Sequence, residues 1–192
     1  MKIGFIAMSG IRACDTELLE LGLTLPGFVE RSKQIASLPS LGLLTLAGMT
    51  PDNHECRYIE IPDLHAESGA LEEFDLVAIS SYSAQIDEAY ELALRYRALG
   101  TPVVMGGTHV TALPHEAKKY CTSVVLGEGE SVWLQILEDA ENKQLKLIYD
   151  ARSLNYSLAN APMPAVGLLD ISKYNRLTVQ TSRGCPHNCE FC

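Results

Sequence analysis

The chain has 192 residues, of which 47% are hydrophobic and 20% charged, and a formal net charge of −9. This length and composition suit a globular domain with a sizeable core, and the negative charge argues against nucleic acid as a partner because phosphate binding needs a basic surface. No segment reaches the roughly 18 consecutive apolar residues of a membrane helix and the first residues lack a signal-peptide pattern, so we expect a cytoplasmic protein without a membrane span.

Short apolar runs recur along the chain and predict the strands of a parallel sheet. Near-continuous apolar runs of this length are typical of strands that are buried on both faces. The predicted strands are Lys2–Met8, Cys56–Ile61, Asp75–Ser81, Pro102–Met105 and Ser123–Leu126.

Segments with apolar residues at helical spacing lie between these runs. We expect helices over Leu38–Met49, Ser83–Leu99, Pro114–Tyr120 and Glu130–Glu141. Strands that alternate with helices predict an α/β fold. The fold expected here is a doubly wound, Rossmann- or flavodoxin-like sheet of five parallel strands joined by right-handed crossovers.

The alternation stops after Glu141. Lys146–Ala151 is a candidate for one more strand, the residues after it are rich in Asn and Pro and predict a linker, and Leu177–Thr181 predicts the first strand of a new unit. The expected organisation is an α/β domain over residues 1–150, a linker over 151–176 and the beginning of an incomplete second domain over 177–192.

Glycine and hydroxyl residues follow the predicted strands at their carboxyl ends. Ligands of open parallel sheets bind at this edge, near the point where the strand order reverses, and glycines let a ligand approach the backbone closely. Glycines that only permit tight turns would give the same pattern. The candidate rim residues are Ser9, Gly10, Ser80, Ser81, Tyr82, Ser83, Gly106, Gly107, Thr108, His109, Gly127, Glu128 and Gly129.

The rim lacks the motifs of nucleotide binding. No phosphate-loop lysine motif is present, and Gly127-Glu128-Gly129 lacks the third glycine of a dinucleotide fingerprint. Glu128 and Glu130 would also repel a pyrophosphate. We therefore expect neither nucleotide hydrolysis nor a Rossmann dinucleotide site.

Three cysteines stand close together near the end of the sequence. Cys185, Cys189 and Cys192 are separated by three and then two residues, and three thiolates in such a loop can hold a four-iron cluster that leaves one iron open. A zinc knuckle with His187 and metal-free cysteines are the alternatives, although zinc motifs usually consist of spaced pairs. The isolated Cys14, Cys56 and Cys121 are interpreted as small buried hydrophobic residues.

The motif Cys185-x-x-x-Cys189-x-Phe191-Cys192 resembles the signature of radical S-adenosylmethionine enzymes. The preceding Thr181–Pro186 is similar to the branch of that family with an N-terminal cobalamin-binding domain. The resemblance implies a [4Fe–4S] cluster on the three cysteines, S-adenosylmethionine near Phe191, and an electron donor for the cluster in the intact enzyme. It also implies that this chain ends inside the radical domain.

Upstream segments carry the same resemblance. Ser37–Met49 resembles the beginning of the first helix of such cobalamin domains, and Gly106–His109 and Gly127–Glu130 resemble their rim loops. Leu168-Leu169-Asp170 and Tyr174 resemble the linker that precedes the radical domain. The resemblance implies that the candidate rim residues contact cobalamin.

One departure concerns the cobalt ligand. Cobalamin domains of the methionine synthase type carry Asp-x-His-x-x-Gly after the first strand, whereas Ser9–Asp15 contains no histidine. Asp63-Leu64-His65 is superficially similar, but it follows the second strand and has Ser68 in place of the glycine. The resemblance therefore implies cobalamin bound without a histidine ligand.

The resemblance implies that the intact enzyme is a methyltransferase, a cyclase or a related enzyme that functionalises C–H bonds of a small-molecule substrate. The present fragment would be inactive alone and would contribute no catalytic residue. The alternative is a non-catalytic α/β module that binds another small molecule or a protein and has lost cobalamin.

Overall fold

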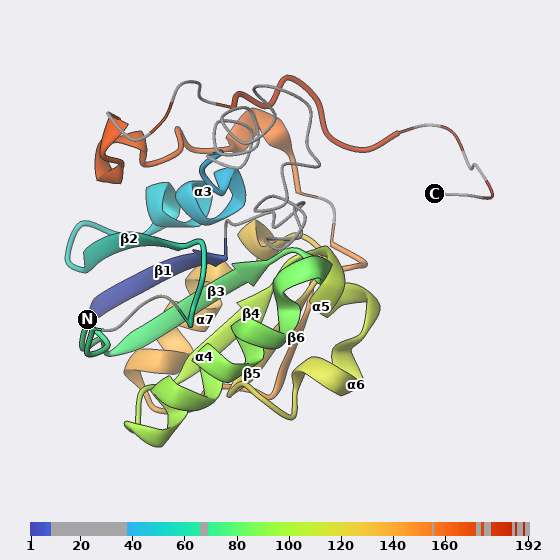
Figure 1. Cartoon of the computed structure of the whole chain (residues 1–192). Coiled ribbons are helices and arrows are strands. Elements are labelled where there is room, and N and C mark those ends of the chain that lie inside the picture. Colours follow the sequence, from blue (N-terminus) through green and yellow to red (C-terminus); the bar gives the residue numbers. More distant parts are fainter. Residues whose placement is uncertain are drawn as a thin grey trace, which may run out of the picture.

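A computed structural model of the chain describes residues 1–8, 38–65, 69–154, 156–171, 174, 178–185, 187 and 190. Six strands form one sheet in the order β2-β1-β3-β4-β5-β6, and every neighbouring pair is parallel (Figure 1). The strand order reverses between β1 and β3. The strands are β1 Lys2–Met8, β2 Glu55–Ile61, β3 Leu76–Ser81, β4 Val103–Gly106, β5 Ser123–Leu126 and β6 Ile148–Asp150.

The doubly wound parallel sheet confirms the predicted fold class, with one strand more than the five expected. The additional strand, β6, lies within the candidate segment Lys146–Ala151 and pairs with β5 from Val124↔Ile148 to Leu126↔Asp150. Its three residues place only Tyr149 in the core, which explains why the apolar pattern of the sequence is weak there.

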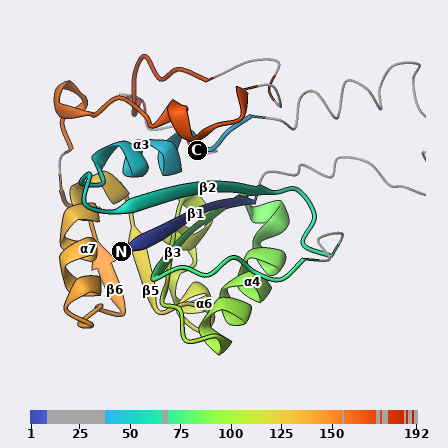
Figure 2. The same ribbon diagram turned by 90° about the vertical axis from the view of Figure 1, so that its left-hand side faces the viewer.

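Helices cover both faces of the sheet, with α3 and α7 on one face and α4, α5 and α6 on the other (Figure 2). Helix α4 is preceded by a 3₁₀ turn, so the predicted helix from Ser83 begins as this turn. Helix α5 was not predicted, because its five residues are too few for a periodic pattern. The helices are α3 Leu41–Met49, α4 Ile86–Ala98, α5 Thr108–Ala112, α6 Pro114–Ala117 and α7 Trp133–Glu141, and the 3₁₀ turns are η1 Ser83–Gln85, η2 Gly129–Ser131, η3 Leu158–Asn160 and η4 Val166–Leu168.

Alternate residues of each strand point to opposite faces, which divides the core in two. In β1, Ile3, Phe5 and Ala7 pack beneath α3 and α7, whereas Ile6 and Met8 pack against the α4 side. The first group meets Trp133 of α7, whose ring centroid lies 5.5 Å from that of Phe5. Trp133 is buried, and its Nε1 donates a hydrogen bond to Thr50 Oγ1 at 2.9 Å.

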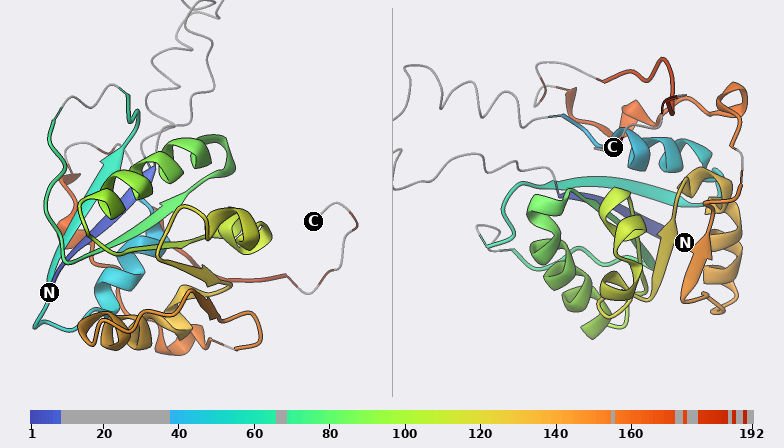
Figure 3. Two further views of the ribbon diagram at one scale, coloured as in Figure 1. Left: turned by 90° about the horizontal axis from the view of Figure 1, so that it is seen from below. Right: turned by 90° about the vertical axis from the view of Figure 1, so that its right-hand side faces the viewer.

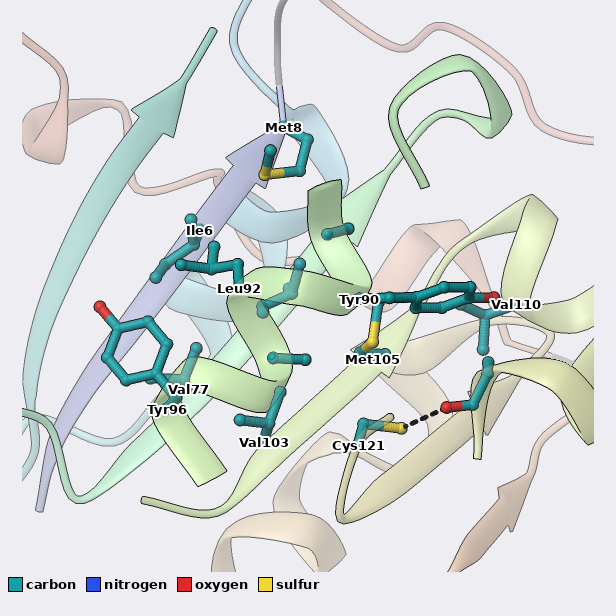
Figure 4. Packing of buried hydrophobic residues seen from close by; sticks show 14 of the residues in the cluster. Ile6, Met8, Val77, Tyr90, Leu92, Tyr96, Val103, Met105, Val110 and Cys121 are labelled. Carbon is teal, nitrogen blue, oxygen red and sulfur yellow. Dashed lines mark hydrogen bonds between the residues drawn. The ribbon is translucent and has the colours of Figure 1, made fainter. Parts of the chain in front are cut away.

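The second core half contains Cys121, between α6 and β5 (Figure 4). Its thiol is buried and donates to the carbonyl oxygen of Ala117 at 3.3 Å. Burial raises the pKa of this thiol to about 11. The structure confirms the prediction of a buried hydrophobic residue for Cys121. Cys56 is only partly buried, and Cys14 lies outside the described residues.

The crossovers do not all have the predicted hand. The connections through α4 and through α5–α6 lie on one face and move along the sheet in one direction, from β3 to β5. The connection from β5 to β6 continues in that direction, but α7 lies on the opposite face. The hand of the β5-to-β6 connection is therefore opposite to that of the connections through α4 and through α5–α6. The prediction that all crossovers are right-handed is wrong. With α7 on this face, Trp133 and Ile136 cover β1, β4 and β5 beside α3.

The chain after β6 continues along the outer side of α3 (Figure 2). The backbone nitrogen of Ala165 donates to the carbonyl oxygen of Leu44 at 2.9 Å. A Cβ at Gly48 would clash with the carbonyl oxygen of Met163, so this glycine allows the close approach. Helix α3 is thus enclosed between the sheet and the residues that follow it by more than a hundred positions.

The predicted strand Leu177–Thr181 is not found, because Thr178–Gln180 are in irregular structure and Thr181 is in a bend. None of the described strands pairs with this segment. Leu177 lies outside the described residues, and so does the long connection over residues 9–37. None of the helices in the described part of the chain is long and apolar enough to cross a membrane.

Candidate functional site

A cavity of about 610 Å³ lies at the carboxyl ends of β3, β4 and β5, beneath α3 and α7. These two helices lie side by side over the same face of the sheet (Figure 3). Cavities of this size are typical of small-molecule and cofactor sites, and the position near the strand-order reversal is where open parallel sheets bind ligands. The lining is mainly apolar and includes Ala78, Ile79, Val104 and Val125 from the strands, Leu43 and Leu46 from α3, and Trp133 and Ile136 from α7.

Two glycines of the rim have backbone conformations that other residues rarely adopt. Gly107 has φ +105° and Gly127 has φ +80°. A Cβ at Gly107 would also lie 3.3 Å from Ser80 Oγ, and one at Gly127 would lie 3.0 Å from the backbone nitrogen of Arg152. Both loops therefore depend on glycine to turn sharply away from the ends of β4 and β5.

Gly106 and Gly129 serve the cavity differently. Neither has a positive φ, and a Cβ at Gly106 would make only ordinary contacts with Val125, the nearest at 3.6 Å. A Cβ at Gly129 would lie 3.7 Å from Leu46. These two glycines leave space between the sheet and α3.

An ion-pair network closes one side of the cavity. Arg183 Nη2 donates to Glu130 Oε1 at 2.7 Å, and Nη1 lies 3.6 Å from Glu128 Oε1. The hydrogen bond to Glu130, opposed by partial burial, raises the pKa of Arg183. The guanidinium also lies 6.0 Å from the centre of the Tyr156 ring. The two rim carboxylates that would repel an anionic ligand are thus both paired with one cation.

Residues 36–137 match the family model of the B12 binding domain. The chain belongs to this family. The match covers more than half of the chain and includes α3, the strands β2 to β5 and the rim loops after β3, β4 and β5.

Several methyltransferases are similar to this B12-binding chain. It is 32% identical over 161 residues to bacteriochlorophyllide d C-8(2)-methyltransferase of Chlorobaculum tepidum, covering 80% of this chain and 35% of that protein. It is 36% identical over 123 residues to the C-12(1)-methyltransferase of the same organism, covering 62% and 27%. It is 26% identical over 163 residues to hopanoid C-2 methylase of Rhodopseudomonas palustris, covering 82% and 30%.

The chain spans about a third of the length of these relatives. No solved structure matches it significantly. Nothing in these comparisons supports the alternative of a module that has lost cobalamin.

The cavity of the B12-binding domain brings together seven of the thirteen predicted rim residues. Ser81, Tyr82, Ser83 and His109 are described but do not line it, and Ser9 and Gly10 lie outside the described residues. The seven lining residues are Ser80, Gly106, Gly107, Thr108, Gly127, Glu128 and Gly129.

His109 belongs to a polar cluster beside the cavity. Its Nδ1 lies 3.0 Å from Ser83 Oγ and its Nε2 lies 3.3 Å from Glu116 Oε1. Tyr90 donates its hydroxyl hydrogen to the same Glu116 oxygen at 2.9 Å. This hydrogen bond, and to a smaller extent the one from His109, lowers the pKa of Glu116. With both ring nitrogens engaged, His109 positions the start of α5 and is not directed into the cavity.

The Asp63-Leu64-His65 segment forms a local turn after β2. The backbone nitrogen of His65 donates to Asp63 Oδ1 at 2.9 Å, and the exposed imidazole lies 3.8 Å from Glu91. His65 does not line the cavity.

Helices α3 and α7 lie within the predicted helices Leu38–Met49 and Glu130–Glu141, but their position over the cavity was not predicted. Helix α3, Leu-Gly-Leu-Leu-Thr-Leu-Ala-Gly-Met, is apolar around its whole circumference, which is typical of a helix covered on more than one side. This property was visible in the sequence and indicates that α3 lies between two layers. The pairing of Arg183 with Glu130 had no such signal.

Of the predicted cluster ligands, Cys185 is described and exposed. Cys189, Cys192 and the neighbouring Phe191 lie outside the described residues. Within the described residues no three His, Cys, Asp or Glu side chains are grouped closely enough to hold a metal ion. Cys185 follows Arg183 by two positions, so the predicted cluster loop begins next to the mouth of the cavity.

Proposed function

We propose that this chain binds cobalamin as the B12-binding part of a radical S-adenosylmethionine methyltransferase that acts on a small molecule. The observation that carries the proposal is the position of the 610 Å³ cavity within the region that matches the B12 binding domain family. Its floor is formed by the strands and its rim by the predicted loops. The names of the similar methyltransferases support methyl transfer as the reaction of the whole protein.

The cavity suits the nucleotide tail of cobalamin. Apolar side chains of Leu43, Leu46 and Trp133 would pack against a flat aromatic base. Ser80 and Thr108 add hydroxyl groups at the rim, where the sugar and phosphate of the tail would pass. The hydroxyl oxygen of a third lining residue, Thr111, accepts a hydrogen bond from the Gly127 nitrogen at 3.0 Å and so holds two rim loops together.

The same proposal includes cobalamin bound without a histidine ligand to cobalt. His109 uses both ring nitrogens in contacts with Ser83 and Glu116, and His65 lies in the turn after β2. His54 lies at the opposite end of the sheet, with Nδ1 3.2 Å from the N-terminal nitrogen.

Cys185, Cys189 and Cys192 would hold the [4Fe–4S] cluster, with S-adenosylmethionine close to Phe191. Bound together, these cofactors would supply the adenosyl radical that removes a substrate hydrogen and the methyl group that replaces it. The division into residues 1–150, 151–176 and 177–192 belongs to this proposal, as does an external electron donor for the cluster. The contribution of the described residues is to bind the cofactor tail and shield it from water.

Titration of the protein with hydroxocobalamin, followed by gel filtration, tests the proposal. We expect a shift of the visible absorption spectrum and about one retained corrinoid per chain. Electron paramagnetic resonance of the Co(II) form is expected to show no nitrogen splitting from a protein ligand. A full-length protein that retains no corrinoid would refute cobalamin binding. A nitrogen splitting that disappears in the His109→Ala variant would show that His109 ligates cobalt and would refute binding without a histidine ligand.

A further inference from the structure

Arg183 connects the rim of the cavity to the start of the predicted cluster loop. It reaches Glu130, 53 residues earlier in the chain, through the 2.7 Å hydrogen bond, and it also contacts Glu128. The same Nη2 also donates to Gln180 Oε1 at 2.9 Å, and the guanidinium lies 6.0 Å from the centre of the Tyr156 ring. The guanidinium is therefore held from both the rim loop and the chain that leads to Cys185.

This ion pair differs from an ordinary surface pair in its burial. The Glu130 side chain is 8% exposed and that of Arg183 25%, whereas Arg95 and Glu91 on α4 are 41% and 42% exposed. A carboxylate that is largely withdrawn from water needs a cation, and removal of that cation is far more disruptive than loss of an exposed pair. Among the described residues, Arg183 is the only cation within ion-pair distance of Glu130.

The backbone on both sides of the pair turns at glycines. Gly184 has φ +82° and separates Arg183 from Cys185, and Gly127 has φ +80° at the start of the rim loop. Each loop leaves its neighbouring element at a conformation that glycine favours. The ion pair is the contact by which the position of one loop constrains the other.

We propose that Arg183 is a positioning residue that couples cobalamin binding at the rim loop to assembly of the iron–sulfur cluster at Cys185, Cys189 and Cys192. The inference rests on the proposed function above. A bound cluster would fix the position of Cys185 and with it that of Arg183, and through Glu130 it would constrain the rim loop that receives cobalamin. Each cofactor then binds more tightly when the other is present, and by thermodynamic linkage the factor is the same in both directions.

The test measures the dissociation constant of hydroxocobalamin for two forms of the full-length protein. One form has a reconstituted cluster, and the other is the cluster-free Cys185→Ala/Cys189→Ala/Cys192→Ala variant. We expect the cluster to raise cobalamin affinity by a factor of about five or more. The measured quantity is the ratio of the cobalamin affinity with the cluster to that without it. In the Arg183→Gln background this ratio falls to about one, and in the Arg183→Lys background part of the increase remains.

The ratio separates positioning from simple destabilisation, because a weakened fold lowers both affinities and leaves their quotient unchanged. Arg95→Gln, which removes an exposed pair on α4, is the matched control and keeps the full ratio. Glu130→Gln removes the same ion pair from the rim side and is expected to abolish the ratio as well. It serves as the alternative variant if Arg183→Gln does not fold.

A ratio of one in the otherwise unchanged protein, or an undiminished ratio in both Arg183→Gln and Glu130→Gln, would overturn the coupling. If neither form of the protein binds cobalamin, the proposed function fails and the inference falls with it. Binding without coupling refutes the inference alone.

Discussion

Replacement of Gly106 by leucine tests whether the cavity holds the cofactor. Gly106 ends β4, and a Cβ there would make only ordinary contacts with Val125, a residue that also lines the cavity. The backbone has no positive φ at this position, so a larger residue causes no strain. The added side chain extends into the cavity, and the fold should remain intact.

The volume of the cavity sets the expected size of the effect. If each added carbon takes up about as much space as a water molecule, ~30 Å³, the four carbons of leucine occupy roughly 120 Å³. This is about a fifth of the 610 Å³ cavity. Overpacking of a filled site costs about 1–3 kcal/mol, which corresponds to an affinity for cobalamin that is about 5- to 150-fold lower.

The assay is a hydroxocobalamin titration monitored by visible absorption, with thermal unfolding of the same samples. Gly106→Ala is expected to weaken binding less than Gly106→Leu. Gly167→Leu, at an open position of η4 that does not line the cavity, is the matched control and should bind normally. Binding of cobalamin to Gly106→Leu with unchanged affinity would show that the tail does not enter this cavity.

Three further substitutions test other features of the structure. Gly107→Ala should lower the free energy of unfolding in urea by about 1–3 kcal/mol, because φ +105° and ψ 179° are essentially restricted to glycine; unchanged stability would contradict the described loop. His109→Ala should leave the spectrum of bound Co(II) cobalamin unchanged while loosening the contact of α5 with Ser83, whereas a changed cobalt signal would identify His109 as a ligand. Burial raises the pKa of Cys121 from its ordinary value of 9.0 to about 11. Between these pH values the folded protein retains a proton that the unfolded chain releases, so the free energy of unfolding falls as the pH rises. The Cys121→Ala variant should lose less stability over this interval in pH-dependent urea unfolding, and an identical pH profile would contradict the burial of the thiol.

The main elements of the fold were predictable because buried strands have a strong local signature. Lys2–Met8 and Ser123–Leu126 have the bounds that their apolar runs indicate. The predictions failed for short elements, such as α5. They also failed for features that depend on packing against other elements, such as the hand of the crossover through α7. The irregular structure at Thr178–Gln180 has the same origin, since a strand requires a partner as well as suitable residues.

For the site, the glycine loops after β4 and β5 were predictable from the types of residues that follow parallel strands. The depth of the site was not, because it depends on how α3 and α7 pack over Gly106 and Gly129. His109 shows the limit of the same reasoning. It follows β4 in the sequence, but the direction of its side chain is set by Ser83 and Glu116 on other elements.

The sequence by itself determined the strand pattern, the rim loops and the resemblance at the cysteines, because each of these is carried by residues that are close together along the chain. Only the tertiary structure decided that the rim surrounds a cavity beneath α3 and α7. It also placed Arg183 beside Glu130. Such contacts join residues that are distant in sequence. A partly buried carboxylate is stabilised by a nearby cation, and only the packing of the whole chain decides which cation lies near it.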